Sequence, residues 1–266
     1  MPPATTAPAA TASPVSPTGA PGAEAPVVGS PYSVVLVAAE DTLALRAAPG
    51  AATRQLDGLL NVARGVRPTG RTARVGGATW WQVRADGRTG WVNSRFLARE
   101  VSATAFRRDE AVDARLEQLV DVVDRRGDLT PVVSRKGLTV ASFAAPVSVP
   151  AGRLAGVLRS TEQQPVGGPG CAPDGCSGTV HALFRDCADH VRDAGGSTTR
   201  DTVVGPRSAA HPVDYQAPFE LANLHYAAVL RSSGADDASW TACYFFFTYE
   251  QGRPVLAGLT RDAPRP

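Results

Sequence analysis

The sequence of 266 residues predicts a multidomain protein in which a small all-β barrel is followed by an α+β domain with helices packed on an antiparallel sheet. Short alternating segments separated by Gly, Pro and Asp turns run through residues 31–101, which is typical of a small barrel. Helical periodicity and then long apolar strands run through residues 106–262, which is typical of an α+β domain. We therefore expect two folded domains with these boundaries, preceded by a disordered tether over residues 1–30.

The tether is predicted from composition. Residues 1–30 consist almost entirely of Pro, Ala, Thr, Ser, Gly and Val, with Glu24 as the only charged residue. Such a segment cannot bury enough apolar surface to offset its ordering entropy. The opening MPPATTAP lacks the basic region and apolar core of a signal peptide, and no apolar run of ~18 residues would cross a membrane. We expect a misplaced or trimmed start; the alternative is that the protein is not exported by the usual route.

The closing hairpin of the barrel is predicted over residues 80–97. Alternation places Trp81 and Val83 on the face that fills the thin core, and Asp86-Gly87 supplies a tight turn before the next strand. Earlier strands are expected at residues 42–46 and 62–69, each ended by a turn that contains Gly.

The same alternation turns Trp80 outward and makes it a candidate recognition surface, because an exposed indole offers a large contact area. The candidate ligand-binding residues are Trp80, Arg84, Arg88 and Trp91. The alternative is that Trp80 covers a neighbouring loop or packs on the second domain, and that Trp91 is structural.

Positive charge is concentrated in the predicted barrel. Its arginines outnumber its acidic residues and can meet anionic polymers or peptide carboxylates, although a charged run is usually a solvated face. These arginines include Arg64, Arg67, Arg71, Arg74, Arg84 and Arg88. No nucleic-acid motif accompanies them, so we expect no nucleic-acid partner.

The phrases LALRAAPG, RGVRPTG, TWWQV and DGRTGWVNSRFL occur in this order, and residues 32–101 thereby resemble the bacterial SH3-like domain family. The resemblance implies an SH3-like barrel that acts as a non-catalytic binding module in extracytoplasmic or cell-wall proteins. It also implies a ligand among peptidoglycan peptides, other wall polymers or a protein partner. We therefore expect an extracytoplasmic location, although the sequence contains no export signal.

Two amphipathic helices are predicted in the second domain. The first begins at Asp109-Glu110 and ends at Gly127, and the second spans residues 179–193. A turn and a strand are expected within 127–144, and a small helix within 152–158. Three strands of a meander are expected at residues 219–230, 239–250 and 254–260.

The blocks GDLTPVVSRKGLTVASFA, PDGCSGTVHALFRD and SWTACYFFFTYEQGRPVLAGLTRDA resemble an uncharacterised bacterial envelope domain. The resemblance implies no known catalytic residues. The cone-shaped fold of the nuclear transport factor 2 superfamily is a further resemblance, and it implies a pocket beneath the sheet. Tyr226, Tyr244 and Phe246 are candidates to line such a pocket, while core packing is the alternative.

An enzymatic alternative comes from PVGGPGCAPDGCSGTVHALF, which resembles the nucleophile segment of NlpC-type cell-wall cysteine peptidases. The resemblance implies Cys176 as nucleophile and His225 as base, with Asp236 or Asp237 orienting the base. The Gly-Asp turn that normally precedes the base strand is missing, and Cys171 is close enough in sequence to trap Cys176 as a disulfide. We therefore assign no catalytic residue, and His225 is expected to be an ordinary sheet residue.

The cysteines have two interpretations. In an oxidising compartment the four cysteines allow three connectivities, one of which joins Cys171 to Cys176 and joins Cys187 on a buried helix face to Cys243 on the sheet. The alternative is a metal site drawn from Cys171, Cys176, His181, Cys187 and His190, whose spacing matches no standard zinc arrangement. We expect disulfides, no metal and no cofactor.

The sequence thus predicts a non-catalytic cell-envelope binding or adaptor protein whose partner is peptidoglycan or another protein. The alternatives are a cysteine peptidase of peptidoglycan that uses Cys176 and His225, and a structural, lipoprotein-like protein that binds no ligand.

Overall fold

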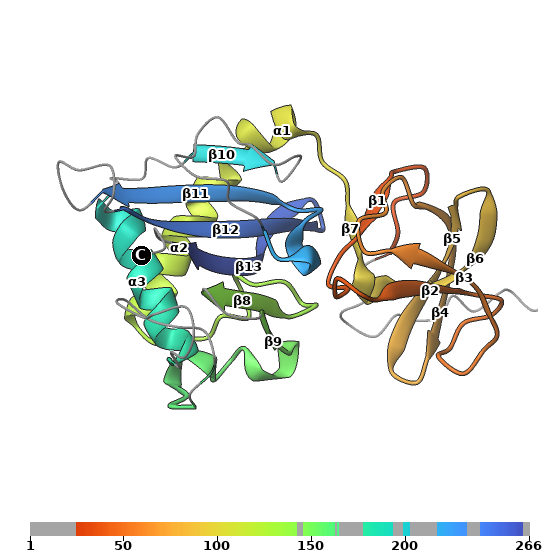
Figure 1. Ribbon diagram of the computed structural model, residues 1–266, viewed down its shortest axis with the longest axis horizontal. Helices are drawn as coiled ribbons and strands as arrows, with labels where there is room; N and C mark the ends of the chain where they lie inside the picture. The colour runs from red at the N-terminus through yellow and green to blue at the C-terminus, as the bar shows by residue number, and fades with distance from the viewer. Residues whose placement is uncertain are drawn as a thin grey trace, which may run out of the picture.

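The computed structural model describes residues 25–142, 146–162, 164, 178–193, 199–202, 217–232 and 240–262. Its strands form three sheets of five, two and six strands, and Figure 1 shows the two smaller sheets beside the larger one. Strands make up 41% and helices 24%, so the described chain is mostly β.

The N-terminal part contains the two smaller sheets, and all of their strand pairs are antiparallel. The five-stranded sheet has the order β3 (Gln55–Leu60), β2 (Thr42–Arg46), β6 (Arg88–Asn93), β5 (Ala78–Ala85) and β4 (Arg67–Val75). The two-stranded sheet pairs β1 (Tyr32–Val34) with β7 (Leu97–Arg99), and the 3-10 turn η1 (Ser94–Phe96) precedes β7.

The predicted closed barrel is wrong for the residues that the structure describes. β3 and β4 form opposite edges of an open sheet and do not pair with each other, and β1 and β7 pair separately. Closure depends on hydrogen bonds between the first and last strands of a sheet, and alternation within single strands does not report such pairing.

The predicted hairpin of β5 and β6 is confirmed. Asp86 and Gly87 have φ of 48° and 75°, so both central residues of the turn have the left-handed conformation that a two-residue hairpin favours. Trp81 and Val83 lie in one buried cluster, as alternation predicted, and Val92 of β6 belongs to the same cluster.

The prediction that Trp80 is exposed is wrong, because the residue is only 5% exposed. Trp80 lies on the interior strand β5, between Ala73 of β4 and Asn93 of β6. Alternation assigns a side chain to a face of the sheet, but it does not say what encloses that face.

The C-terminal part is built on the six-stranded sheet. Its order is β10 (Thr199–Thr202), β11 (His225–Ser232), β12 (Trp240–Glu250), β13 (Arg253–Asp262), β8 (Leu138–Ser142) and β9 (Val147–Val149). The expected antiparallel sheet is wrong at one pair, because β8 runs parallel to β13. Parallel neighbours require a long connection, and here the chain between β8 and β13 includes the helix α3 and the other four strands of the sheet.

The two long helices are confirmed as α2 (Ala111–Asp124) and α3 (Val180–Asp193). The strand predicted from residue 219 begins only at His225, because residues 219–221 form the 3-10 turn η4 (Phe219–Leu221). The small helix predicted at 152–158 is a pair of 3-10 turns. The remaining helical elements are α1 (Ala103–Arg107), η2 (Ala151–Arg153) and η3 (Val157–Arg159).

The two faces of the large sheet bury different sets of side chains. Phe245 and Phe247 of β12 join a cluster that contains the apolar residues of α2 and α3. Tyr244 and Phe246, which alternate with them, join a second cluster on the opposite face. Burial raises the pKa of Tyr244, with Asp262 and Tyr226 adding to the effect. Tyr226, Tyr244 and Phe246 therefore pack in the core, as the alternative prediction held, and do not line a ligand pocket.

The second cluster also joins the two parts of the chain. Val35 and Ala98 from the N-terminal part are buried in it beside Leu221 and Leu224 from the C-terminal part. Backbone and side-chain hydrogen bonds follow the same boundary, from Leu36 N to the Glu220 carbonyl (2.9 Å) and from Asn223 Nδ2 to the Val34 carbonyl (2.8 Å). The two parts are therefore held in one fixed arrangement.

The predicted disulfide between Cys187 and Cys243 is confirmed, and it ties α3 to β12. Cys171 and Cys176 lie outside the described residues, so their pairing stays a prediction. Within the described part of the chain, no helix combines the length and apolar character needed to cross a membrane.

Candidate functional site

A groove of about 530 Å³ lies where the two parts of the chain meet. One wall comes from the β4–β5 turn, the start of β5 and η1, and the other comes from the segment before β8, from η2 and from the β12–β13 turn. The lining includes Gly76, Gly77, Trp81, Arg95, Arg135, Lys136 and Glu250. Neither part of the chain forms this groove alone.

The lining carries an excess of positive charge. Arg95, Arg135 and Lys136 contribute cations, whereas Glu250 is the only acidic residue of the described lining. The exposed guanidinium groups of Arg95 and Arg135 form no ion pair with any described residue, and that of Arg95 lies 5.9 Å from the centre of the Phe96 ring. The groove therefore attracts anions.

Glu250 is held by its own wall of the groove. Its Oε1 atom accepts a hydrogen bond from Ser134 Oγ at 2.6 Å and another from the Arg135 backbone N–H at 3.1 Å. Lys136 crosses the boundary between the two parts, because its ammonium group donates to the Leu97 carbonyl. These contacts fix the cationic segment 134–136 against both parts of the chain.

Two hairpin turns border the groove. Gly76 and Gly77 have φ of 60° and 78°, and Gln251 and Gly252 have φ of 52° and 75°. Positive φ at both central residues is the geometry that short hairpins require. A Cβ atom added to Gly76 or Gly77 would meet nothing within 4 Å, so the glycine turn leaves its side of the groove open.

Trp81 is also a lining residue of the groove, and it is only 3% exposed. The ring packs edge-on against Tyr32 with the ring centres 5.3 Å apart. Its Nε1–H has no hydrogen-bond partner among the described residues. Trp81 therefore connects the groove directly to the N-terminal core.

The binding residues predicted from the sequence do not line this groove. Trp80 is buried, and Trp91 is half-buried beside Gln82 on the five-stranded sheet. Arg88 forms an ion pair with Asp57 (2.9 Å), while Arg84 is exposed. Sequence reasoning missed the groove because its two walls are about forty residues or more apart in the chain. The single lysine, Lys136, was the one available signal.

Two neighbours hold the His225 ring in a fixed orientation. Its Nε2 atom lies 2.6 Å from the Val101 carbonyl, and because a carbonyl only accepts, Nε2 must donate. The ring also stacks on Phe106 with the ring centres 4.9 Å apart. Cys176, Asp236 and Asp237 lie outside the described residues, so the peptidase alternative stays a prediction.

The histidines of α3 have different surroundings. Burial and the charges of Arg126 and Arg185 lower the pKa of His181. His190 is 2% exposed and makes hydrogen bonds through both ring nitrogens.

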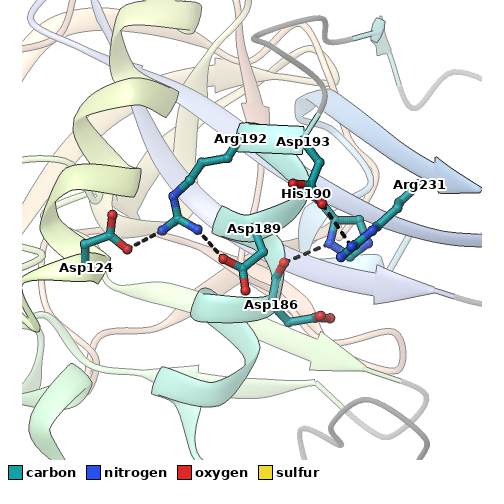
Figure 2. A network of polar contacts seen from close by, with 7 residues as sticks. All are labelled: Asp124, Asp186, Asp189, His190, Arg192, Asp193 and Arg231. Carbon is teal, nitrogen blue, oxygen red and sulfur yellow. Dashed lines mark hydrogen bonds and ion pairs between the residues drawn. The ribbon is translucent and has the colours of Figure 1, made fainter. Parts of the chain in front are cut away.

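A network of polar contacts surrounds His190 in Figure 2. Arg192 joins Asp189 and Asp124, and Arg231 pairs with Asp193 at 3.0 Å. These ion pairs are largely exposed, so each contributes little to stability. His190, by contrast, is buried, and its Nε2 atom forms a hydrogen bond with Thr241 of β12.

Comparison of the chain with protein-family models, with curated proteins and with solved structures finds no match. The resemblance of residues 32–101 to the bacterial SH3-like family therefore stays a prediction.

Proposed function

We propose that this protein is a non-catalytic binding protein of the cell envelope, and that the groove between its two parts binds a short peptide through the peptide's carboxylate groups. The observation that carries the proposal is the pair of exposed guanidinium groups of Arg95 and Arg135, which form no ion pair with any described residue. A guanidinium group presents a planar array of donors that matches a carboxylate.

The size of the groove supports a small ligand. Its volume of about 530 Å³ lies within the range typical of sites for small molecules and short peptides. Open backbone at Gly76 and Gly77 lets a peptide approach closely, since no side chain occupies that wall. A peptide of a few residues with one or two carboxylates fits both the volume and the charge.

The fixed arrangement of the two parts also supports binding. Association costs free energy when a binding site must first be ordered. Here the apolar cluster that contains Val35, Ala98 and Leu224 holds the two walls together through core contacts of the chain itself. The site is therefore organised before the peptide arrives.

The envelope location rests on two considerations. The Cys187–Cys243 disulfide favours an oxidising compartment. The resemblance of residues 32–101 to the SH3-like family points to wall peptides, whose stems carry free carboxylates. Soluble stem peptides of peptidoglycan are therefore the first ligands to test.

The test is a calorimetric titration of the full chain with stem peptides, compared with the same peptides after amidation of their carboxyl groups. We expect the carboxylate form to bind and Arg95→Gln/Arg135→Gln to weaken binding roughly tenfold or more, because a hydrogen bond to a charged group contributes about 1.5–3 kcal/mol.

Arg84→Gln is the matched control, since Arg84 is an exposed arginine outside the groove. Equal affinity for the amidated peptide, or wild-type affinity of the double variant, contradicts the proposal. If Arg84→Gln is the only variant that loses binding, the peptide binds at the face of the five-stranded sheet that carries Arg84, and the proposal is contradicted.

A further inference from the structure

A second cluster of reactive side chains lies between α3 and β12, away from the groove. The ligand atoms of Asp186, His190 and Cys243 lie within 4.8 Å of one another. The sulfur of Cys187 is bonded to that of Cys243, so it belongs to the same cluster. The cluster therefore contains two sulfurs, one imidazole and one carboxylate, which are ligand types that zinc prefers.

Helical spacing brings three of these residues together. Asp186, Cys187 and His190 stand at i, i+1 and i+4 on α3, which places them on adjacent positions of one helix face. Both cysteines are 0% exposed and His190 is 2% exposed. Cys243 completes the set from the strand that this helix face packs against.

The contact of His190 with Asp186, a dashed line in Figure 2, holds the imidazole in a metal-binding tautomer. Its Nδ1 atom lies 2.8 Å from the backbone carbonyl of Asp186. A carbonyl only accepts, so Nδ1 carries a hydrogen, and in the neutral ring the lone pair is on Nε2. That lone pair now accepts from the Thr241 hydroxyl at 2.6 Å. Metal-bound histidines commonly donate their other N–H to a backbone carbonyl in this way.

The carboxylate of Asp186 is also held in a fixed orientation by a hydrogen bond. Asp186 Oδ2 accepts a hydrogen bond from Arg261 Nε at 2.5 Å, and the side chain of Arg261 is only 6% exposed. This pair is electrically neutral as it stands. Adding one divalent cation and two thiolates leaves the cluster neutral again, which buried charge requires. Without a metal, the negative charges of two thiolates would have no positive charge to compensate them.

We propose that the chain with the Cys187–Cys243 disulfide reduced binds one zinc ion through the sulfurs of Cys187 and Cys243, Nε2 of His190 and a carboxylate oxygen of Asp186. A dithiol supplies two electrons and two protons, the S–S bond breaks into two thiols, and the dithiol is oxidised to its own disulfide. Zinc then displaces one proton from each thiol to solvent. The helix and strand that the disulfide joins are thereby joined by the metal.

The experiment uses the full chain carrying Cys171→Ser/Cys176→Ser, so that Cys187 and Cys243 are its only sources of thiol. The chain is reduced with a phosphine in denaturant, refolded without oxygen and titrated with Co²⁺ as a spectroscopic substitute for Zn²⁺. We expect one Co²⁺ per chain, a thiolate-to-cobalt absorption band and protection of both thiols from alkylation. The oxidised chain is expected to show none of these signals.

His190→Ala is expected to weaken Co²⁺ binding roughly tenfold or more, while His181→Ala on the same helix leaves it unchanged. Circular dichroism reports whether each variant and the reduced chain fold. A reduced chain that folds without a thiolate band overturns the proposal. So does a reduced chain that stays unfolded with Co²⁺ present, or Co²⁺ affinity that His181→Ala and His190→Ala lower equally.

Discussion

At the scale of single residues, Arg261 and Asp186 form the most buried ion pair that the structure describes. A buried charge that loses its partner is far more costly than an exposed one, because water no longer compensates it. The pair between Arg153 and Glu162 provides the contrast, since both side chains are largely exposed.

Arg261→Met is expected to lower the free energy of unfolding by about 3 kcal/mol, because it leaves the Asp186 carboxylate in the interior without this partner. Arg153→Met is expected to lower it by less than about 1 kcal/mol. Denaturant unfolding of both variants measures the difference. Equal effects of the two substitutions would contradict the account of Arg261.

Gly90 on β6 is a second residue whose identity is fixed by packing. A Cβ atom at this position would lie 2.7 Å from Leu45 Cγ and 2.9 Å from the Arg46 carbonyl oxygen. Gly90→Ala is therefore expected to destabilise the protein by about 1–3 kcal/mol. Gly152→Ala, where the new atom meets nothing within 4 Å, is the control. An unfolding midpoint unchanged by Gly90→Ala would refute the close approach of β2 and β6.

At the scale of elements, the disulfide is the covalent connection between α3 and the sheet. Cys187 and Cys243 are separated by 56 positions in the sequence, and both sulfurs lie in the core between the helices and β12. Closing such a loop lowers the entropy of the unfolded chain, and the folded chain gains stability by comparison.

Cys187→Ala/Cys243→Ala is expected to lower the free energy of unfolding by about 4 kcal/mol on the loop-closure model. The expected loss is confined to stability, because neither cysteine lines the groove. Chemical denaturation and peptide titration of the same variant check both statements. A variant of wild-type stability would show that the packing of α3 does not depend on the bond.

At the scale of the whole molecule, the apolar cluster between the two parts determines that the protein behaves as one body. Ala98 of β7 and Leu224 before β11 are buried in it together. The groove exists only while this contact holds, since each part supplies one wall.

We expect the wild-type chain to unfold in a single calorimetric transition. Ala98→Glu, which places a charge in the cluster, is expected to separate the transitions of the two parts and to abolish peptide binding. Two transitions in the wild-type protein would contradict the single-body account. So would normal peptide binding by Ala98→Glu.

Local features of the fold could be predicted from the sequence, whereas features that depend on distant segments could not. Alternation and turn residues predicted the hairpin of β5 and β6, and helical periodicity predicted α2 and α3, because these signals are local. The open sheet, the parallel pairing of β8 with β13 and the burial of Trp80 depend on contacts between distant segments. The groove was missed for the same reason, since Arg95 and Arg135 come from different parts of the chain.

Mapping of amide chemical shifts during titration with a carboxylate-bearing peptide locates the peptide on the protein residue by residue. We expect shifts that saturate together at Gly76, Gly77, Arg95 and Lys136, with little change at Trp91 and Arg84. Shifts confined to Trp91 and Arg84, or no saturable shift with any acidic peptide, would contradict peptide binding in the groove.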